Sequence, residues 1–142
     1  MVEYPPIPTT WEELVALRTY LDSCPGSYLR HPEDQKFYDL YQEHVPREIF
    51  LEIIKKQINP DRRAILKNRF PYSNVLQNLP DVGHYILWSF DGQLNDSQIE
   101  EEVKKQFPDH QWFVVESAPN RKSVPEIWHT HIFVKGIPQY SL

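Results

Sequence analysis

Residues 123–134, which read Ser-Val-Pro-Glu-Ile-Trp-His-Thr-His-Ile-Phe-Val, decide the fold class of the second half of this chain. Their β-branched and aromatic side chains predict a strand over Ile127–Val134. Side chains alternate between the two faces of a strand, so His129 and His131 share one face, about 6.6–7 Å apart along the backbone. Imidazole can ligate a metal, carry a proton near neutral pH or bind a phosphate, which makes this pair the first candidate site.

Four residues share the opposite face of this strand, which is the more apolar of the two: Trp128, Thr130, Ile132 and Val134. That face is predicted to pack on helices. The histidine face is then either open to solvent or lines a cleft beneath the N-terminal half of the chain.

The segments that precede the histidine strand continue the strand pattern. Gly83–Phe90 and Trp112–Glu116 are rich in aromatic and β-branched residues and predict two further strands. Between them, Asn95 can cap a helix that ends near Gln106. Glutamates early in this helix and lysines late in it suit the helix dipole.

The first part of the chain has a helical period. Helices are predicted over about residues 11–22, 32–44 and 46–58, with a short helical piece around 62–67. The first of these begins with a capping box at Thr10–Glu13.

The order of elements predicts an α+β protein. An N-terminal helical bundle or cap would pack on a small, mostly antiparallel sheet with one intervening helix. At 142 residues, a single domain over 1–142 is expected. Its helical half spans about 10–67, and its strand–helix–strand–strand half spans about 81–135.

Composition excludes several classes of protein. The net charge of −5 disfavours nucleic acid and anionic membranes as partners. The single cysteine, Cys24, excludes an internal disulfide and fits a reducing compartment. Neither a membrane-spanning run nor a signal peptide is apparent. The expected protein is soluble and cytoplasmic, with the nucleus as an alternative.

His84, at the start of the first predicted strand, is a third candidate. If the first and third predicted strands are neighbours, their spacing of about 4.8 Å would let His84 join His129 and His131. The alternative is a histidine on the surface. A metal bound by His129 and His131 would need at least one more ligand, with His84, Glu116 and Glu126 as the candidates.

The segment Asn68–Tyr72 is a second concentration of polar and aromatic residues and reads Asn-Arg-Phe-Pro-Tyr. Its asparagine and proline fix a turn between the two halves of the chain. Arg69 could grip a phosphate or carboxylate through its planar guanidinium, and Arg121 and Lys122 could add positive charge. Asn68, Arg69, Tyr72, His84 and Arg121 are therefore the candidate ligand-binding residues.

Known nucleotide-binding patterns are missing or incomplete. With four glycines, the chain contains neither a P-loop nor a dinucleotide-binding fingerprint. The histidine strand is similar to the alternating-histidine motif of the histidine-triad nucleotide hydrolases. However, Ile127 and Phe133 stand where a third histidine would be needed.

Taken together, several motifs resemble the fungal N-acetylglucosamine-induced protein family, a domain of unknown function. They are Trp11–Leu14, Asn68–Tyr72, His84–Ser89, Trp112-Phe113 and Ser123–Phe133. The resemblance covers about residues 10–135. It implies a soluble intracellular protein that is associated by name with the response to an amino sugar, without an assigned catalytic group.

Two functional hypotheses follow. In the first, the protein binds or processes a small phosphorylated or sugar-like anion. His129 and His131 would be acid/base groups or metal ligands, Glu126 would orient them, and Arg69 would hold the anion. In the second, the protein is a non-catalytic interaction module, in which exposed tryptophans and tyrosines bind a protein partner and the histidines are structural. Neither hypothesis predicts a cofactor beyond the divalent metal, or an oligomeric state.

Overall fold

The computed structural model describes residues 4–21, 23–58, 62–115 and 127–138. Within these ranges the chain forms six helices: α1 (Trp11–Ala16), α2 (Arg18–Leu21), α3 (Gly26–Leu29), α4 (Pro32–His44), α5 (Arg47–Ile58) and α6 (Asp96–Gln106). The same ranges contain four strands: β1 (Arg63–Lys67), β2 (Val82–Ser89), β3 (Trp112–Val115) and β4 (Trp128–Lys135).

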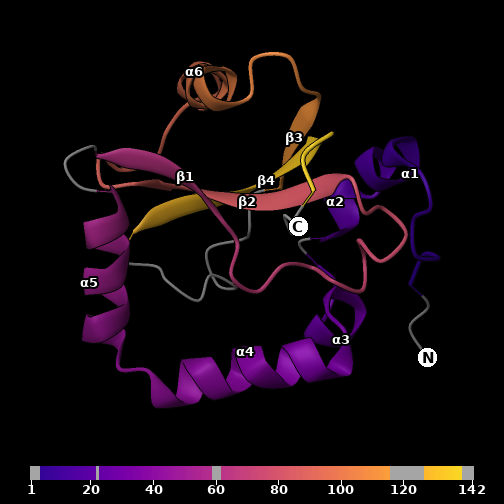
Figure 1. Cartoon of the computed structure of the whole chain (residues 1–142), viewed down its shortest axis with the longest axis horizontal. Coiled ribbons are helices and arrows are strands. Elements are labelled where there is room, and N and C mark those ends of the chain that lie inside the picture. The colour runs from indigo at the N-terminus through magenta and orange to yellow at the C-terminus, as the bar shows by residue number, and fades with distance from the viewer. Residues whose placement is uncertain (1–3, 22, 59–61, 116–126, 139–142) are drawn as a thin grey trace.

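All three strand pairs are antiparallel, and the strand order is β1-β2-β4-β3. α6 lies over one face of this sheet, and α4 runs beneath the other (Figure 1). The α+β class and the antiparallel sheet with one intervening helix are thus confirmed. Because β4 lies between β2 and β3, the histidine strand occupies the middle of the sheet.

The apolar face of β4 packs on a helix, as its sequence predicts. A capping box starts α6, in which the Asn95 side chain accepts from the Gln98 backbone and the Gln98 side chain accepts from the Asn95 backbone. Ile99 and Val103 of this helix are buried in one cluster with Ile132 of β4. The other face of the sheet, with His129 and His131, is therefore the one that faces the N-terminal helices.

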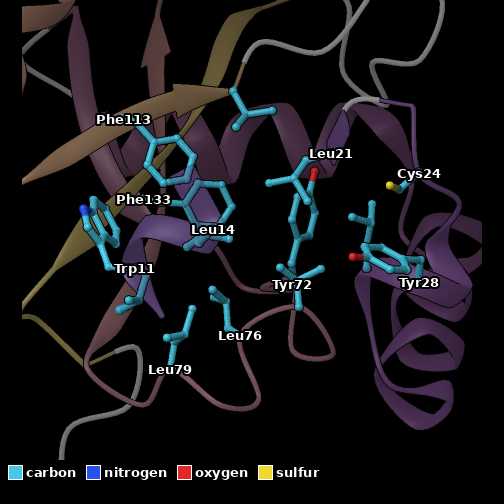
Figure 2. Packing of buried hydrophobic residues seen from close by; sticks show 14 residues of the cluster. Trp11, Leu14, Leu21, Cys24, Tyr28, Tyr72, Leu76, Leu79, Phe113 and Phe133 are labelled. Atoms are coloured by element: carbon cyan, nitrogen blue, oxygen red, sulfur yellow. The ribbon is translucent and has the colours of Figure 1, made fainter. Parts of the chain in front are cut away.

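The core on that second face is aromatic near the β3 edge. The rings of Phe113 and Phe133 stack at 5.1 Å between centroids, and Trp11 packs on Phe113 at 5.3 Å. Figure 2 shows Leu14 against the same rings and Tyr72 further along the cluster. This cluster anchors α1 and α2 on the sheet. Other segments of the chain cover the sheet below β2.

One predicted helical piece is wrong, because Arg63–Lys67 forms the edge strand β1. The segment pairs with β2 in register, with Ile65 opposite Leu87. Ile65 packs in the cluster beneath α6, whereas Ala64 and Leu66 contact the cluster on the other face, which is the two-residue period of a strand. The helices of the first half therefore end at Ile58 and not near residue 67.

Helix α4 forms over its predicted residues, but it does not pack into the core. None of its residues is buried, and Phe37 and Leu40 are 63% and 39% exposed. Tyr38 and Tyr41, on its other side, are half-buried. α4 thus spans a space below the sheet. In the described ranges, no helix is long and apolar enough to cross a membrane.

Candidate functional site

A cavity of about 460 Å³ lies beneath the histidine face of the sheet. Its walls come from β1, β2 and β4 on one side, from α4 and α5 on the other, and from the turn at residues 68–72. His129 and His131 both line it, so the histidine face lines a cleft and is not an open surface. Cavities of this size are typical of small-molecule sites.

β2 and β4 are neighbours, as the strand-adjacency hypothesis assumed, and this pairing brings His84 to His131, although His84 does not itself line the cavity. β2 pairs with β4 so that His84 lies opposite Phe133 and Ile86 lies opposite His131. The His84 Nε2 atom is 2.8 Å from the His131 Nδ1 atom, and the His129 and His131 ring centroids are 6.4 Å apart. His84 is wholly buried, so the alternative of a surface histidine is wrong.

Hydrogen bonds fix the proton position on His84. The backbone N–H of Tyr72 can only donate, and its nitrogen lies 3.1 Å from the His84 Nδ1 atom. Nδ1 therefore accepts, and the proton of the neutral ring is on Nε2, from which it is donated to His131. Burial, followed by the neighbouring His131 and Arg30, holds the pKa of His84 well below its ordinary value, so the ring stays neutral.

The two histidines that line the cavity consequently have opposite hydrogen-bonding characters. His131 accepts at Nδ1, so its neutral ring carries the proton on Nε2. The His129 Nδ1 atom lies 3.0 Å from the carbonyl oxygen of Ile127, which can only accept. His129 therefore carries its proton on Nδ1, and its Nε2 atom is the basic nitrogen.

Asn68 and Tyr72 position this group. Asn68 is buried, and its side-chain oxygen accepts from the backbone N–H of Phe70 at 2.9 Å. Its amide nitrogen can then only donate, and it lies 3.4 Å from the accepting Nδ1 atom of His84. Tyr72 packs edge-on against His84 and stacks on His131 at 5.4 Å between centroids. The turn predicted at Asn68–Tyr72 thus supports the histidines directly.

Arg30 is a residue of this site that the sequence did not suggest. It is 7% exposed, and it donates from Nε to the Phe70 carbonyl at 2.8 Å and from Nη1 to the Gln35 side chain at 3.2 Å. Its guanidinium lies over the ring of Tyr38 at 4.2 Å. Burial lowers the pKa of Arg30. Among the described residues, no carboxylate lies within ion-pair distance of it.

Planar side chains surround the cavity in a closed series of contacts, which we call the planar girdle. Its nine members all line the cavity: Arg30, Tyr38, Tyr41, Phe50, Phe70, Tyr72, Trp88, His129 and His131. Each contacts the next, with separations of 4.2 to 6.4 Å. The girdle draws on six separate segments of the chain, so no sequence motif contains it.

The lining is cationic although the whole chain carries a net charge of −5. Arg30, Lys67 and Arg69 line the cavity, and its described lining contains no aspartate or glutamate. Arg69 is exposed, with its guanidinium 5.4 Å from the Tyr41 ring centroid. The charged side chains of the described lining are thus all positive, and a concave surface with one sign of charge concentrates counter-ions.

Several predicted site residues lie outside the described ranges, namely Glu116, Arg121, Lys122 and Glu126. Among the described residues, no three His, Cys, Asp or Glu side chains are arranged to hold a metal ion. Both ring nitrogens of His84 are engaged in this arrangement, Nδ1 with the backbone N–H of Tyr72 and Nε2 with His131.

Comparison with known proteins shows the fold and leaves the function open. No protein-family model and no curated protein matches this chain. The crystal structure of HTC1 is similar, with a TM-score of 0.53 and 18% sequence identity, over 92% of this chain and 88% of that one. This likeness shows a shared α+β fold. The resemblance to the N-acetylglucosamine-induced protein family stays a prediction.

Proposed function

We propose that this protein binds a small organic anion, phosphorylated or sugar-like, in the cavity beneath its histidine strand. The observation that carries this proposal is the guanidinium of Arg30, which is buried at the cavity wall with no carboxylate within ion-pair distance among the described residues, although Asp34 and Asp39 act on it from further away. A buried charge without an ion-pair partner costs several kcal/mol. An anion in the cavity would supply the missing charge.

The fixed contacts of Arg30 leave donors for such a ligand. A guanidinium has five N–H groups, of which Nε and one on Nη1 are directed to Phe70 and Gln35. The remaining N–H groups offer the forked pattern that matches a phosphate or carboxylate. Lys67 and Arg69 add two further positive charges to the same cavity.

The histidines give the site a capacity for proton transfer. Neutral His131 presents a donor at Nε2, and neutral His129 presents a basic Nε2 atom. A hydroxyl or carbonyl group of the ligand near both rings could receive a proton from one and give a proton to the other. We therefore propose His129 and His131 as acid/base groups of a small-molecule enzyme or as polar contacts of a binding protein, acting in the cytoplasm.

A thermal-shift screen of untagged protein tests the proposal. Sugar phosphates, including glucosamine 6-phosphate because of the family resemblance, and nucleotides would be the probes, and metal content would be measured in parallel. A ligand at about 100 times its Kd adds about 2.7 kcal/mol of stability, which for a chain of this size raises Tm by roughly 5–10 °C.

Two arginine variants make this screen specific to the cavity. Arg69→Gln removes a cation from the lining and is expected to reduce the Tm shift. Arg18→Gln, an exposed position on α2 that is not part of the lining, is expected to leave the shift unchanged. No shift with any phosphorylated probe, or equal shifts in wild type and Arg69→Gln, would contradict the proposal.

An interaction module remains the second candidate, on the basis of exposed apolar side chains. Phe37 and Leu40 of α4 and Ile49 of α5 are all more than a third exposed. The tryptophans do not form the predicted docking surface, because Trp11 and Trp88 are buried and the other two are half-buried. This candidate is favoured if Phe37→Ser abolishes cellular function while a His129→Ala/His131→Ala double variant preserves it.

A further inference from the structure

We infer that the anion is a phosphorylated planar heterocycle, a nucleoside monophosphate in its chemical class, with its ring held by the planar girdle and its phosphate at Arg30. This inference rests on the proposed function and narrows it from small organic anions in general to one class. The geometry of the girdle carries it.

The girdle connects Arg30 to Trp88 by two routes. One route runs through Tyr72, His131 and His129, with successive separations of 5.2, 5.4, 6.4 and 4.8 Å. The other runs through Tyr38, Phe70, Tyr41 and Phe50, with separations of 4.2, 5.4, 5.3, 6.0 and 6.2 Å. Arg30 and Trp88 are therefore four contacts apart along one route and five along the other, so the buried guanidinium and the indole are not neighbours in the girdle.

A planar ring is the ligand that gains most from such a wall. Stacking of a base on an aromatic side chain contributes about 1–3 kcal/mol, whichever base is involved, because every base has a π-face. A saturated sugar ring has no π-face, so it contacts an aromatic side chain only through its C–H groups. The aromatic side chains of Trp88 and Phe50 thus favour a base over a simple sugar phosphate.

The polar groups of the lining suit the edges of a base. Gln42 and Gln57 line the cavity, and each amide side chain has both a donor and an acceptor, whereas the amides of Gln35 and Asn68 are engaged by Arg30, Asp39, Phe70 and His84. Proteins read an unstacked base through hydrogen bonds to its edge while apolar side chains hold its faces. The lining therefore contains both types of contact that a base requires.

Size and charge agree with a monophosphate. A cavity of about 460 Å³ has room for a ring with its phosphate, and inorganic phosphate alone would leave most of it unfilled. Arg30, Lys67 and Arg69 favour a phosphate dianion over an uncharged nucleoside. The ligand should therefore need both its base and its phosphate for full affinity.

Calorimetric titration of the full chain separates these contributions. The probes are 5′-AMP, adenosine, ribose 5-phosphate and glucosamine 6-phosphate. We expect 5′-AMP to bind at least about fivefold more tightly than either sugar phosphate, which is the lower limit of base stacking. We also expect it to bind more tightly than adenosine, which lacks the phosphate.

Substitution of Trp88 locates the base. Trp88→Leu should bring the affinities for 5′-AMP and ribose 5-phosphate to within about twofold of each other. Trp88→Phe, which keeps an aromatic face, should retain most of the preference and shows whether the position tolerates substitution. In the wild type, 5′-AMP should quench tryptophan fluorescence, and this quenching should be lost in Trp88→Phe, because Trp88 is the tryptophan among the described lining residues.

The outcomes distinguish this inference from the function on which it rests. Equal affinity for 5′-AMP and the sugar phosphates would overturn the inference while leaving an anion-binding cavity. Equal affinity for 5′-AMP and adenosine would contradict both the inference and the proposed function, because the phosphate would then contribute nothing. An unchanged preference in Trp88→Leu would also overturn the inference. If no phosphorylated probe binds, the proposed function itself fails.

Discussion

Replacement of His84 by phenylalanine tests the hydrogen-bonded support of the site. The imidazole is wholly buried and has partners on both ring nitrogens, at 3.1 Å to the Tyr72 nitrogen and at 2.8 Å to the His131 Nδ1 atom. Phenylalanine can occupy a similar place between the neighbouring rings, but its side chain neither accepts nor donates a hydrogen bond. His84→Phe therefore removes both hydrogen bonds and leaves their partners inside the protein.

The expected loss of stability follows from these two contacts. A buried donor or acceptor that loses its partner costs about 1–3 kcal/mol. His84→Phe should therefore lower the free energy of unfolding by about 2–5 kcal/mol near pH 7.5. Equilibrium unfolding in guanidinium chloride measures this difference, with the m-value as a check that the unfolded state is comparable.

The pH dependence of this loss gives a second measure. Because the folded pKa of His84 is lowered, the unfolded chain binds a proton below about pH 6.5 that the folded chain does not bind. The stability that neutral His84 contributes is therefore complete above that pH and declines as the pH falls. The deficit of His84→Phe should shrink by about 1.4 kcal/mol between about pH 7.5 and pH 5.5.

An exposed histidine is the matched control. His44 lies at the end of α4, and His44→Phe should change stability by no more than about 0.5 kcal/mol near pH 7.5. A cost below about 1 kcal/mol for His84→Phe, or a deficit that grows on acidification, would refute the proposed hydrogen bonding and the neutral state of His84.

Three further predictions concern the site and its scaffold. Long-range proton–nitrogen NMR spectra at about pH 7.5 should show an unprotonated Nε2 in His129 and an unprotonated Nδ1 in His131. The same tautomer in both rings would contradict the assignment of the His129 Nε2 atom as a hydrogen-bond acceptor and of the His131 Nε2 atom as a donor. Asn95→Ala should cost about 1 kcal/mol in urea unfolding, because it removes the cap of α6, whereas a negligible cost would show that the capping box contributes little. Phe133→Ala should cost about 3–5 kcal/mol by the same assay, because its ring is fully buried between Phe113 and His84; a cost near that of a surface substitution would contradict this packing.

The sequence predicted the histidine strand well because its information is local. Alternation along Ile127–Val134 assigned each side chain to a face, and the cap at Asn95 marked the start of α6 correctly. The convergence of His84 with His131 needed only one assumption about which strands are neighbours. These features depend on residues that are close in sequence or directly paired across a sheet.

The remainder of the site depends on contacts that have no local signature. Arg30 lies between the short helix α3 and the long helix α4. Its importance comes from burial beside Tyr38 and Tyr72, which the sequence pattern does not encode. β1 was mistaken for a helical piece because five residues are too few to establish a period. The cavity exists because α4 spans the space without burying a side chain, which is a property of tertiary packing alone.

The affinity of the cavity for a phosphorylated ligand in wild type and in Arg30→Gln tests the central claim most directly. Titration calorimetry with the most strongly stabilising phosphorylated probe should show a loss of about tenfold or more in Arg30→Gln, because hydrogen bonds to charged groups contribute about 1.5–3 kcal/mol. Circular dichroism would establish that the variant is folded, and Arg18→Gln should bind as the wild type does. A folded Arg30→Gln variant whose Kd stays within twofold of the wild-type value would contradict the claim that this buried guanidinium holds the anion.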